Sequence, residues 1–399
     1  MGDQISQCKE AFCPIEEEEI EIGVRVQALV AKEWWGPRPL QAGDVGIVIG
    51  FKNGNTDWEV QFDGVKGGMN PSEFKVVQKD FPSLESKFFK ETIRLGKGGF
   101  AEVYRGVRKG QQPRDGYVAI KQFIKDPINM KSQRKQLRTE VALFVRIASC
   151  NSPLLLYFEG AFEDAQNFYM VYEYVAGGDF DDKIKEIGTS FVADREQGYT
   201  QDFMSAIRSL HSAHIVHRDI KPLNFLVFKS QPGSLESTAS GANWRYGRLK
   251  LCDFGLARDC STFPKDGSGK LIVELCDECG TPNYQAPEQL LLKQQGTTYS
   301  FPVDLWAAGI CLYMLLHAGA HPFAKGDDID YDKLRQGKVS KAGKHSLMKL
   351  TKESPDTDPK EALKELCRSL LNKEADLRPT ADEVIRKQLW CPSSDRKRK

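Results

Sequence analysis

The fold of this chain is decided by residues 217–224, which read HRDIKPLN. Three further motifs follow in order: DFG at residues 253–255, GTPNYQAPE at 280–288 and DLWAAG at 304–309. The tripeptide LRP at residues 377–379 completes the series. Each motif taken singly is weak, but chance agreement of the whole ordered set is negligible.

A glycine-rich segment lies upstream, where residues 96–101 read GKGGFA. The strand pattern VYRGV follows at residues 103–107, so the glycines are expected to join two antiparallel strands. A dinucleotide-binding fingerprint would instead open a helix. Because Gly96, Gly98 and Gly99 have no side chains, the backbone of this turn can approach a phosphate group closely.

A lysine follows in the apolar strand pattern VAIK at residues 118–121. An ammonium group among apolar neighbours is costly without a partner of opposite charge. The candidate partner is Glu140, which lies on a segment with helical periodicity at residues 135–148. Lys121 and Glu140 could also be an ordinary surface lysine and glutamate, an alternative that the remaining motifs disfavour.

This ordered set resembles the eukaryotic protein kinases of the serine/threonine type over residues 88–390. The resemblance implies an α+β chain with the two-lobed protein kinase fold, in which a β-rich N-lobe precedes a helical C-lobe. Helical periodicity at residues 196–211 and 362–371 fits such a C-lobe. The resemblance also implies ATP and Mg²⁺ as cofactors, and transfer of the γ-phosphate of ATP to Ser and Thr hydroxyls of protein substrates.

Four side chains carry the chemistry that the resemblance implies. Asp219 accepts the proton of the substrate hydroxyl, or at least aligns it, and Lys221 offsets charge on the transferring phosphoryl group. Asn224 and Asp253 ligate Mg²⁺, since both offer hard oxygen donors. Because phosphoryl transfer needs little covalent help, positioning is expected to be the main contribution of the protein.

ATP binding is likewise implied by the resemblance. Lys121 is expected to hold the α- and β-phosphates while Glu140 fixes its ammonium group. Asp179 is expected to reach either the ribose hydroxyls or a basic residue of a substrate. The other implied ATP-binding residues are the loop glycines, the apolar side chains around adenine and the connecting segment beside its edge, namely Leu95, Gly96, Gly98, Gly99, Val103, Ala119, Glu173, Val175 and Leu226.

The acceptor type follows from two positions of the resemblance. Lys221 and Thr281 indicate Ser and Thr acceptors, because tyrosine kinases generally carry different residues at both places. Two positions depart from the family pattern. Ala101 occupies the place of the third glycine, and Leu223 stands where many base-directed kinases have an acidic residue, which weakens a prediction of arginine-rich substrates.

Regulation by resemblance centres on Arg218, which precedes the catalytic Asp219. In kinases with this arrangement, a phosphate on the activation segment usually neutralises the arginine. Related kinases often carry the phosphorylated threonine four residues before Thr281, where this sequence has Asp277. Either Asp277 pairs with Arg218 and lessens dependence on activating phosphorylation, or it belongs to a solvated acidic turn.

Three further residues are expected to hold the architecture of the C-lobe. Glu288 and Arg378 should form a buried ion pair. Asp304 should accept backbone hydrogen bonds near His217.

Residues 20–80 are predicted to form a small all-β domain that resembles SH3-like barrels. Turn signals stand at residues 53–54 (NG) and 63–64 (DG). Two tryptophans at residues 34–35 could hold a peptide or another part of this chain, or could fill the core of a tiny domain. Alternation of apolar with polar or small residues predicts strands at 24–30, 45–49, 58–62 and 74–77.

The two ends of the chain are predicted to lie outside these domains. Residues 1–19 are expected to form a flexible segment. Gly2 with Ser6 satisfies the spacing for N-myristoylation, so lipid anchoring through Gly2 is one alternative for this end. Residues 391–399 form a basic tail, which is either a nuclear address or a solvated end.

Composition excludes several classes of protein. The 399 residues contain 56 basic and 55 acidic side chains, so no nucleic-acid partner is expected. The longest apolar stretch, residues 306–320, is interrupted and falls short of the roughly 20 residues of a transmembrane helix, so no such segment is expected. The 10 cysteines have irregular spacings, which favours a reducing, cytoplasmic compartment.

Two other functions stay open. The chain could be a pseudokinase, a signalling scaffold that binds nucleotide or partners without turnover, although Lys121, Asp219, Asn224 and Asp253 argue against it. Alternatively, the N-terminal barrel could be the main functional unit and recruit the kinase domain to a partner.

Overall fold

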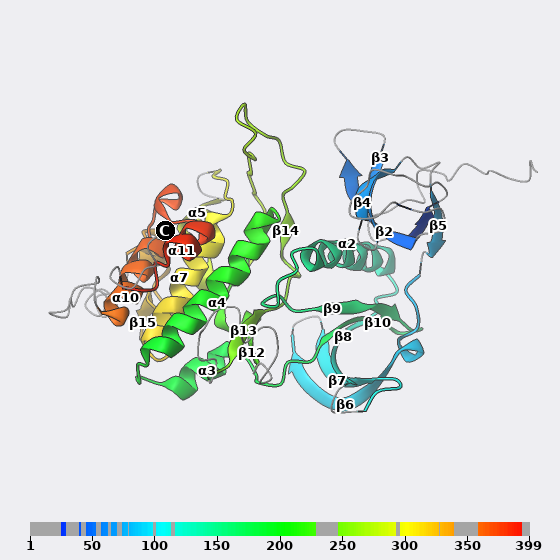
Figure 1. Cartoon of the computed structure of the whole chain (residues 1–399), viewed down its shortest axis with the longest axis horizontal. Coiled ribbons are helices and arrows are strands. Elements are labelled where there is room, and N and C mark those ends of the chain that lie inside the picture. The colour runs from blue at the N-terminus through cyan, green and yellow to red at the C-terminus, as the bar shows by residue number, and fades with distance from the viewer. Residues whose placement is uncertain are drawn as a thin grey trace, which may run out of the picture. The chain divides into compact units, whose positions relative to one another are not determined.

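The computed structural model divides the chain into two compact units (Figure 1). Unit 1 comprises residues 1–149 and 158–173, and unit 2 comprises residues 150–157 and 174–399. The residues that the structure describes are 25–28, 40, 45–52, 57–62, 65–69, 74–78, 80–98, 101–112, 116–228, 246–292, 296–326, 328–338 and 358–392.

Unit 1 begins with an antiparallel sheet of strand order β4-β3-β2-β1-β5. The four predicted strands are confirmed, but the sequence does not predict β4, because VKGGM contains two glycines and no clear alternation. The turn signals at 53–54 and 63–64 and the tryptophans at 34–35 lie outside the described residues, and closure into a barrel stays a prediction. The strands are β1 (Arg25–Ala28), β2 (Val45–Lys52), β3 (Asp57–Phe62), β4 (Val65–Met69) and β5 (Phe74–Gln78).

A second antiparallel sheet follows in unit 1, with strand order β6-β7-β8-β10-β9. Its first hairpin carries the glycine-rich turn between antiparallel strands, as the sequence predicts. The strands are β6 (Phe88–Lys97), β7 (Glu102–Arg108), β8 (Tyr117–Ile124), β9 (Phe158–Glu163) and β10 (Asn167–Glu173). A cluster of buried residues in the core of this sheet comprises Leu84, Phe88, Val118, Ile120, Phe162, Tyr169 and Val171. Leu84 belongs to the 3₁₀ helix η3 (Leu84–Ser86).

Helix α2 (Met130–Ala148) packs against β9 within unit 1. It begins before the predicted segment 135–148, because residues 130–134 contain neither Gly nor Pro and extend the helix. Phe144 of α2 stacks on Phe158 of β9 with ring centroids 4.7 Å apart. Apolar packing thus joins the helix that carries Glu140 to the sheet that carries Lys121.

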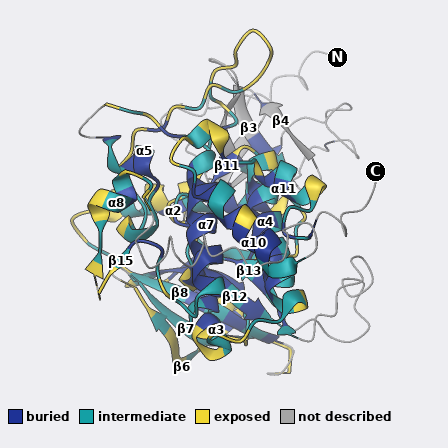
Figure 2. Cartoon of the chain, turned by 90° about the vertical axis from the view of Figure 1, so that its left-hand side faces the viewer, coloured by how far each residue is buried: buried dark blue, intermediate teal, exposed yellow. Residues whose placement is uncertain are grey.

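Unit 2 is built around helix α7 (Pro302–Leu316), which is buried from Val303 to Leu315 (Figure 2). A helix that is apolar on all sides requires neighbours on all sides. Here α4 (Ala193–Ser212) and α10 (Pro359–Leu370) pack against it, so the apolar stretch at 306–320 belongs to a protein core. Among the described residues, no helix has the length and apolar character needed to cross a bilayer. The other helices of unit 2 are α3 (Phe180–Ile187), α5 (Pro287–Leu290), α8 (Tyr331–Arg335) and α11 (Ala381–Lys387).

Short antiparallel strand pairs frame the two central motifs of unit 2. Strand β11 (Ile215–Val216) pairs with β14 (Arg258–Asp259), and β12 (Phe225–Phe228) pairs with β13 (Arg248–Leu251). The HRDIKPLN motif therefore runs from β11 to β12, and the DFG motif from β13 to β14. Residues 229–245, between β12 and β13, lie outside the described residues.

The predicted buried ion pair between Glu288 and Arg378 is confirmed. Two nitrogens of Arg378 donate to the two carboxylate oxygens of Glu288 at 2.6 and 2.9 Å. The Arg378 side chain has 0% exposure and also donates to the carbonyl of Pro302. One guanidinium group thus ties α5 to the start of α7.

Candidate active site

The backbone of the loop between β11 and β12 is hydrogen-bonded to Asp304, a carboxylate of α7. Asp304 accepts hydrogen bonds from the backbone N–H groups of His217 and Arg218, at 2.8 and 2.9 Å, which confirms the predicted contact. His211 of α4 also contacts Asp304, with Nε2 2.9 Å from the carboxylate. Burial acts to raise the pKa of Asp304, but the hydrogen bond from His211 and nearby positive charge outweigh it, and the pKa lies below its usual value.

Asp219 lies in this loop, and its carboxylate accepts hydrogen bonds from three predicted site residues. Its Oδ2 accepts hydrogen bonds from Lys221 Nζ at 2.7 Å and Asn224 Nδ2 at 3.1 Å. Its Oδ1 accepts from Thr281 N at 2.8 Å and Thr281 Oγ1 at 2.7 Å. Burial opposes ionisation, yet the hydrogen bonds from Lys221 and Thr281 prevail, and the pKa of Asp219 is lowered. The carboxylate is therefore ionised at neutral pH.

The two predicted metal ligands lie at the ends of one strand pair. Asn224 directly precedes β12, and Asp253 follows β13. Cys252 N donates to Asn224 O at 2.8 Å, so the antiparallel pairing brings both positions together. Asn224 directs Nδ2 at Asp219, which leaves its amide oxygen as the atom suited to a cation.

The donor set fits Mg²⁺ bound jointly with phosphates. In the described part of the chain, no three or more His, Cys, Asp or Glu side chains are grouped so that they could hold a metal ion by themselves. Mg²⁺ is usually bound by one or two carboxylates together with substrate phosphates, and a carboxylate with an amide oxygen is such a partial set.

Unit 1 brings several predicted nucleotide-binding residues onto one sheet. Val103 of β7 pairs with Lys121 of β8, and Ala119 lies on the same face of β8 as Lys121 because side chains alternate. Val118 and Ile120 on the opposite face of β8 are buried, whereas Ala119 and Lys121 are partly accessible. Gly98 N donates to Ala101 O at 2.8 Å and closes the glycine-rich turn. Of the remaining predicted residues, Gly96 lies at the end of β6, Leu95 is 41% exposed, Glu140 lies on α2, and Gly99 lies outside the described residues.

Unit 2 holds the remaining predicted nucleotide-binding residues. Asp179 and Leu226 form an isolated antiparallel bridge, so these two predicted residues lie side by side. Asp179 caps α3 by accepting a hydrogen bond from Asp182 N at 2.9 Å. Of the connecting segment, Glu173 ends β10 in unit 1, and Val175 follows that strand in unit 2.

Arg218 joins three segments of unit 2. Its guanidinium group donates to the carbonyl of Leu256 at 2.6 Å, to Asp277 Oδ2 at 3.1 Å and to Tyr299 OH at 3.2 Å. Tyr299 OH in turn donates to the carbonyl of Asp277 at 2.8 Å. Leu275 and Tyr299 exchange two backbone hydrogen bonds of 2.9 Å each. The structure thus places Asp277 against Arg218, as one of the two alternatives expects.

Sequence reasoning does not find His211 or Tyr299. Tyr299 contacts Arg218 of the catalytic loop from a segment distant in sequence, whereas His211 contacts Asp304, the residue that holds the loop. Neither residue belongs to a motif. The only signal for His211 is a histidine in the last turn of a helix, which is more often a cap that interacts with the helix dipole. Tyr299 carries no signal, because its role depends on a backbone bridge to Leu275.

Comparison with known proteins gives consistent results. The sequence model described as "Protein kinase domain" matches residues 89–390. The chain is 30% identical over 292 residues to "Serine/threonine-protein kinase DCLK3" of Mus musculus, covering 73% of this chain and 31% of that protein. It is 34% identical over 235 residues to "Myosin light chain kinase A" of Dictyostelium discoideum, covering 59% and 67%. It is 33% identical over 264 residues to "Serine/threonine-protein kinase DCLK1" of Rattus norvegicus, covering 65% and 52%. The chain thus spans from about a third to two thirds of the length of these relatives.

Proposed function

The chain belongs to the protein kinase family, and we propose that it is an active serine/threonine-protein kinase, which transfers the γ-phosphate of ATP to Ser and Thr hydroxyls of protein substrates. The observation that carries the proposal is the set of contacts that orient Asp219, from Lys221, Asn224 and Thr281. The alternative is a pseudokinase that binds nucleotide or partners without turnover. Such a protein has no need for a carboxylate oriented by three side chains.

Asp219 mainly orients the acceptor hydroxyl. Its lowered pKa makes it a weak base, so it accepts a proton efficiently only when the oxygen has become acidic in the transition state. Lys221 Nζ lies 2.7 Å from both Asp219 Oδ2 and Thr281 Oγ1. The ammonium group is therefore fixed beside the reacting hydroxyl, where it offsets charge on the transferring phosphoryl group.

ATP and Mg²⁺ are the proposed cofactors. Asn224 and Asp253 are the residues that would hold Mg²⁺, which supplies charge neutralisation on the phosphates when it is bound. Lys121 holds the α- and β-phosphates, and Glu140 fixes the ammonium group of Lys121. Adenine packs against the apolar side chains among the proposed ATP-binding residues. Asp179 contacts either the ribose hydroxyls or a basic residue of the substrate. The other proposed ATP-binding residues are Leu95, Gly96, Gly98, Gly99, Val103, Ala119, Glu173, Val175 and Leu226.

Arg218, Asp277 and Thr281 are the proposed regulatory residues. The 3.1 Å contact between Arg218 and Asp277 supports a carboxylate in the place of an activating phosphate. A carboxylate supplies one negative charge, where a phosphate supplies about 1.5 to 2. The activation segment of this chain therefore depends less on phosphorylation than one with threonine at this place.

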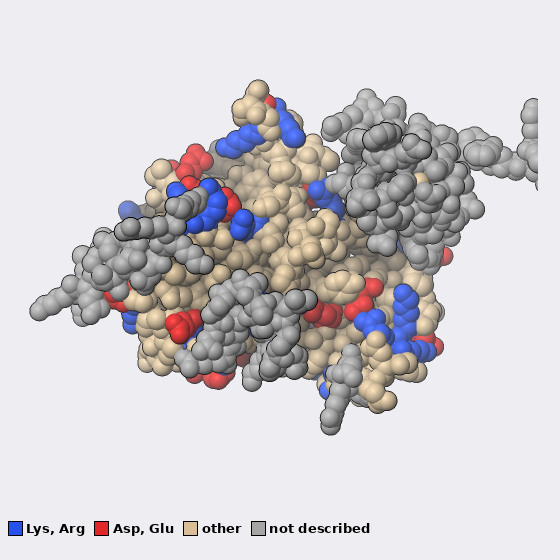
Figure 3. All heavy atoms as spheres, viewed as in Figure 1, with Lys and Arg blue, Asp and Glu red and all other residues tan. Residues whose placement is uncertain are grey.

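The proposal also covers the ligand of the N-terminal domain, the absence of a nucleic-acid partner and the location of the protein in the cell. The N-terminal sheet binds a peptide or another part of this chain. Figure 3 shows basic and acidic side chains interspersed on the face in view, which supports the absence of a nucleic-acid partner. The irregularly spaced cysteines support a cytoplasmic location. Gly2, the proposed lipid acceptor, lies outside the described residues.

The decisive experiment is transfer of radiolabelled γ-phosphate from ATP, with Mg²⁺, to an array of Ser- and Thr-containing peptides. We expect the full chain to label the array and Asp219→Asn to lower kcat by at least about 100-fold. Asp382→Asn removes a half-exposed carboxylate of α11 that pairs with Arg386, and it serves as the matched control with unchanged kcat. Equal, background incorporation by the full chain and by Asp219→Asn would establish the pseudokinase alternative.

A further inference from the structure

Residues 80–84, which we call the strap, lie just before the region that the protein kinase model matches. The strap is bonded to the second sheet of unit 1 through Glu163, the last residue of β9. Phe81 N donates to Glu163 Oε1 at 2.8 Å, and Glu163 N donates to Pro82 O at 2.9 Å. Leu84 is 5% exposed and belongs to the core of the same sheet. The chain that precedes the kinase domain is therefore built into that sheet.

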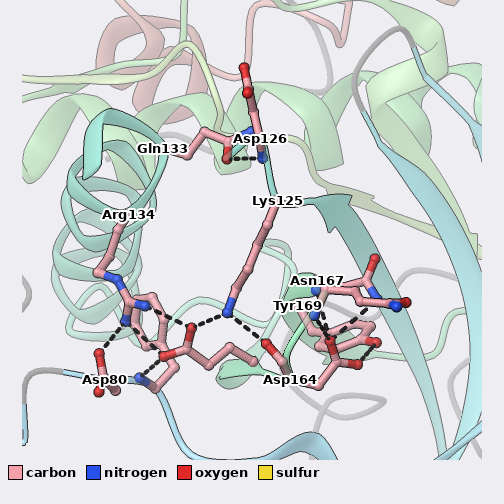
Figure 4. Close-up of polar contacts among 11 residues, drawn as sticks. Asp80, Lys125, Asp126, Gln133, Arg134, Asp164, Asn167 and Tyr169 are labelled. Atoms are coloured by element: carbon pink, nitrogen blue, oxygen red, sulfur yellow. Dashed lines mark hydrogen bonds and ion pairs between the residues drawn. The ribbon is translucent and has the colours of Figure 1, made fainter. Parts of the chain in front are cut away.

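The side chain of Glu163 is nearly buried, and its carboxylate accepts hydrogen bonds from two cationic side chains. Its side chain is 9% exposed. Arg134 of α2 donates to both oxygens, at 2.7 and 3.0 Å, and Lys125, which follows β8, donates to Oε2 at 2.7 Å. Figure 4 shows Arg134 and Lys125 reaching from these two elements toward the same acidic oxygens. A bidentate pair of this kind fixes direction as well as distance.

Arg134 also connects α2 to the strap. Nη1 of Arg134, which donates to Glu163 Oε1, also donates to Asp80 Oδ1 at 2.7 Å (Figure 4). The guanidinium carbon lies 5.3 Å from the centre of the Phe168 ring, and Lys125 Nζ lies 4.6 Å from it. Phe168 is fully buried, so one side of the cluster is apolar, which strengthens the interactions of Arg134 and Lys125 with the nearly buried Glu163.

The N-terminal end of α2 has few other polar anchors. Asn129, the N-cap residue, makes no side-chain capping hydrogen bond, and the first turn contains no acidic residue. Gln133 supplies two hydrogen bonds: its Oε1 accepts from Asp126 N at 2.8 Å, and its Nε2 donates to the carbonyl of Ile124 in β8 at 3.2 Å. Phe144 on Phe158 is an apolar contact of α2 with the sheet, and apolar contacts permit packed helices to slide.

We propose that Glu163 is a positioning residue for phosphoryl transfer, which through Arg134 fixes α2 on the sheet and thereby fixes Glu140 relative to Lys121. This inference rests on the proposed function, because Glu140 matters only if Lys121 holds ATP. The strap adds Asp80 and the Phe81 N–H group to the same cluster. Whatever displaces the strap consequently loosens α2, so the region before the kinase domain can modulate ATP binding without contacting ATP.

The test uses full-length Glu163→Gln and Arg134→Met. Amide hydrogen exchange of residues 130–148 reports on α2, equilibrium binding of ATP with Mg²⁺ reports on Lys121, and kcat and KM for ATP report on the reaction. Arg105→Met breaks a similar ion pair, between Arg105 of β7 and Glu91 of β6 at 2.5 Å in the same sheet, and is the matched control. Exchange of α7 serves as the internal control for global stability.

We expect exchange in α2 to rise about tenfold in both variants, with α7 and Arg105→Met unchanged. ATP binding and KM should weaken about tenfold, more than kcat falls. Arg134→Lys keeps the positive charge but loses the bidentate geometry, so its α2 exchange and ATP binding should lie between those of the wild type and of Arg134→Met. Asp80→Asn should weaken ATP binding only about twofold, because Asp80 is exposed. The proposal is overturned if α2 exchange stays at the wild-type level, or if it rises while ATP binding does not change. Absence of turnover in the wild type would sink the proposed function alone, since exchange and binding still decide the role of Glu163.

Discussion

Single charged residues hold the backbone of the catalytic loop in a conformation that the chain would not otherwise prefer. Arg218 has a φ of +69°, in the left-handed region that costs a non-glycine residue free energy. Asp304 offsets this cost by accepting the N–H of Arg218 and that of His217. Gly280, with φ of +97°, has no Cβ because such an atom would lie 2.5 Å from the Arg218 carbonyl oxygen. The strain next to Asp219 is therefore built in by neighbours on both sides.

Asp277 provides the first prediction at this scale. Asp277→Asn should lower kcat about two- to fivefold, because the pair with Arg218 is partly exposed and such pairs contribute up to about 1 kcal/mol. Glu274→Gln, an exposed acidic residue of the same segment, is the matched control. Activity of phosphatase-treated wild type should be retained. Complete inactivation by phosphatase, with recovery on rephosphorylation of Ser261, Thr262 or Ser268, would refute the role of Asp277.

The sequence alone predicts the contacts of some site residues but not of others. The motifs alone place Asp219, Lys221 and Asn224, because these residues are close in sequence and their contacts are local. Glu163 and Tyr299 are beyond prediction. Their partners come from distant segments, and only the folded chain brings those segments together.

Elements of secondary structure are predicted where burial gives a clear period. Helix α4 and strands β2 and β3 follow their apolar patterns. Strand β4 is missed because glycines interrupt its pattern and pairing with β3 supplies its stability instead. The start of α2 is missed because Lys131 and Ser132 are polar and exposed and the following Gln133 and Arg134 are polar, so no apolar period marks the first turn. Periodicity reports burial, so it fails wherever an element lies on the surface.

The buried pair between α5 and the helical core gives a prediction about elements. Arg378→Met leaves Glu288 without its partner and should lower the free energy of unfolding by about 3 to 5 kcal/mol. Arg386→Met, which breaks the exposed pair with Asp382 on α11, should cost less than about 1 kcal/mol. Urea denaturation of both variants makes the comparison. Equal losses would show that the Glu288 pair contributes no more than a surface pair.

At the scale of the whole molecule, the proposed kinase reaction requires residues from both units. Lys121 belongs to unit 1, whereas Asn224 and Asp253 belong to unit 2. The chain crosses between the units after Ser149, after Tyr157 and after Glu173. Each unit thus contributes part of the set of residues proposed to hold the metal-bound triphosphate.

Thermal stabilisation by ATP with Mg²⁺ tests this division of labour. A ligand at 100 times its Kd adds about 2.7 kcal/mol to the free energy of unfolding, which raises the Tm by a few degrees. Lys121→Met and Asp253→Asn, one in each unit, should each abolish most of the shift. Asp219→Asn should retain it, because Asp219 acts on the acceptor hydroxyl. A shift that survives both Lys121→Met and Asp253→Asn would place the nucleotide elsewhere.

The anchoring of the HRDIKPLN loop on α7 has a consequence for the lifetime of the active conformation. The amides of His217 and Arg218 end on a carboxylate of a helix with no solvent-facing side. Local fraying cannot release them, so their protons should be replaced by deuterium only as often as the entire C-terminal unit opens. A preparation that ages or is gently warmed should accordingly lose its peripheral segments to proteases first, and lose the geometry around Asp219 last.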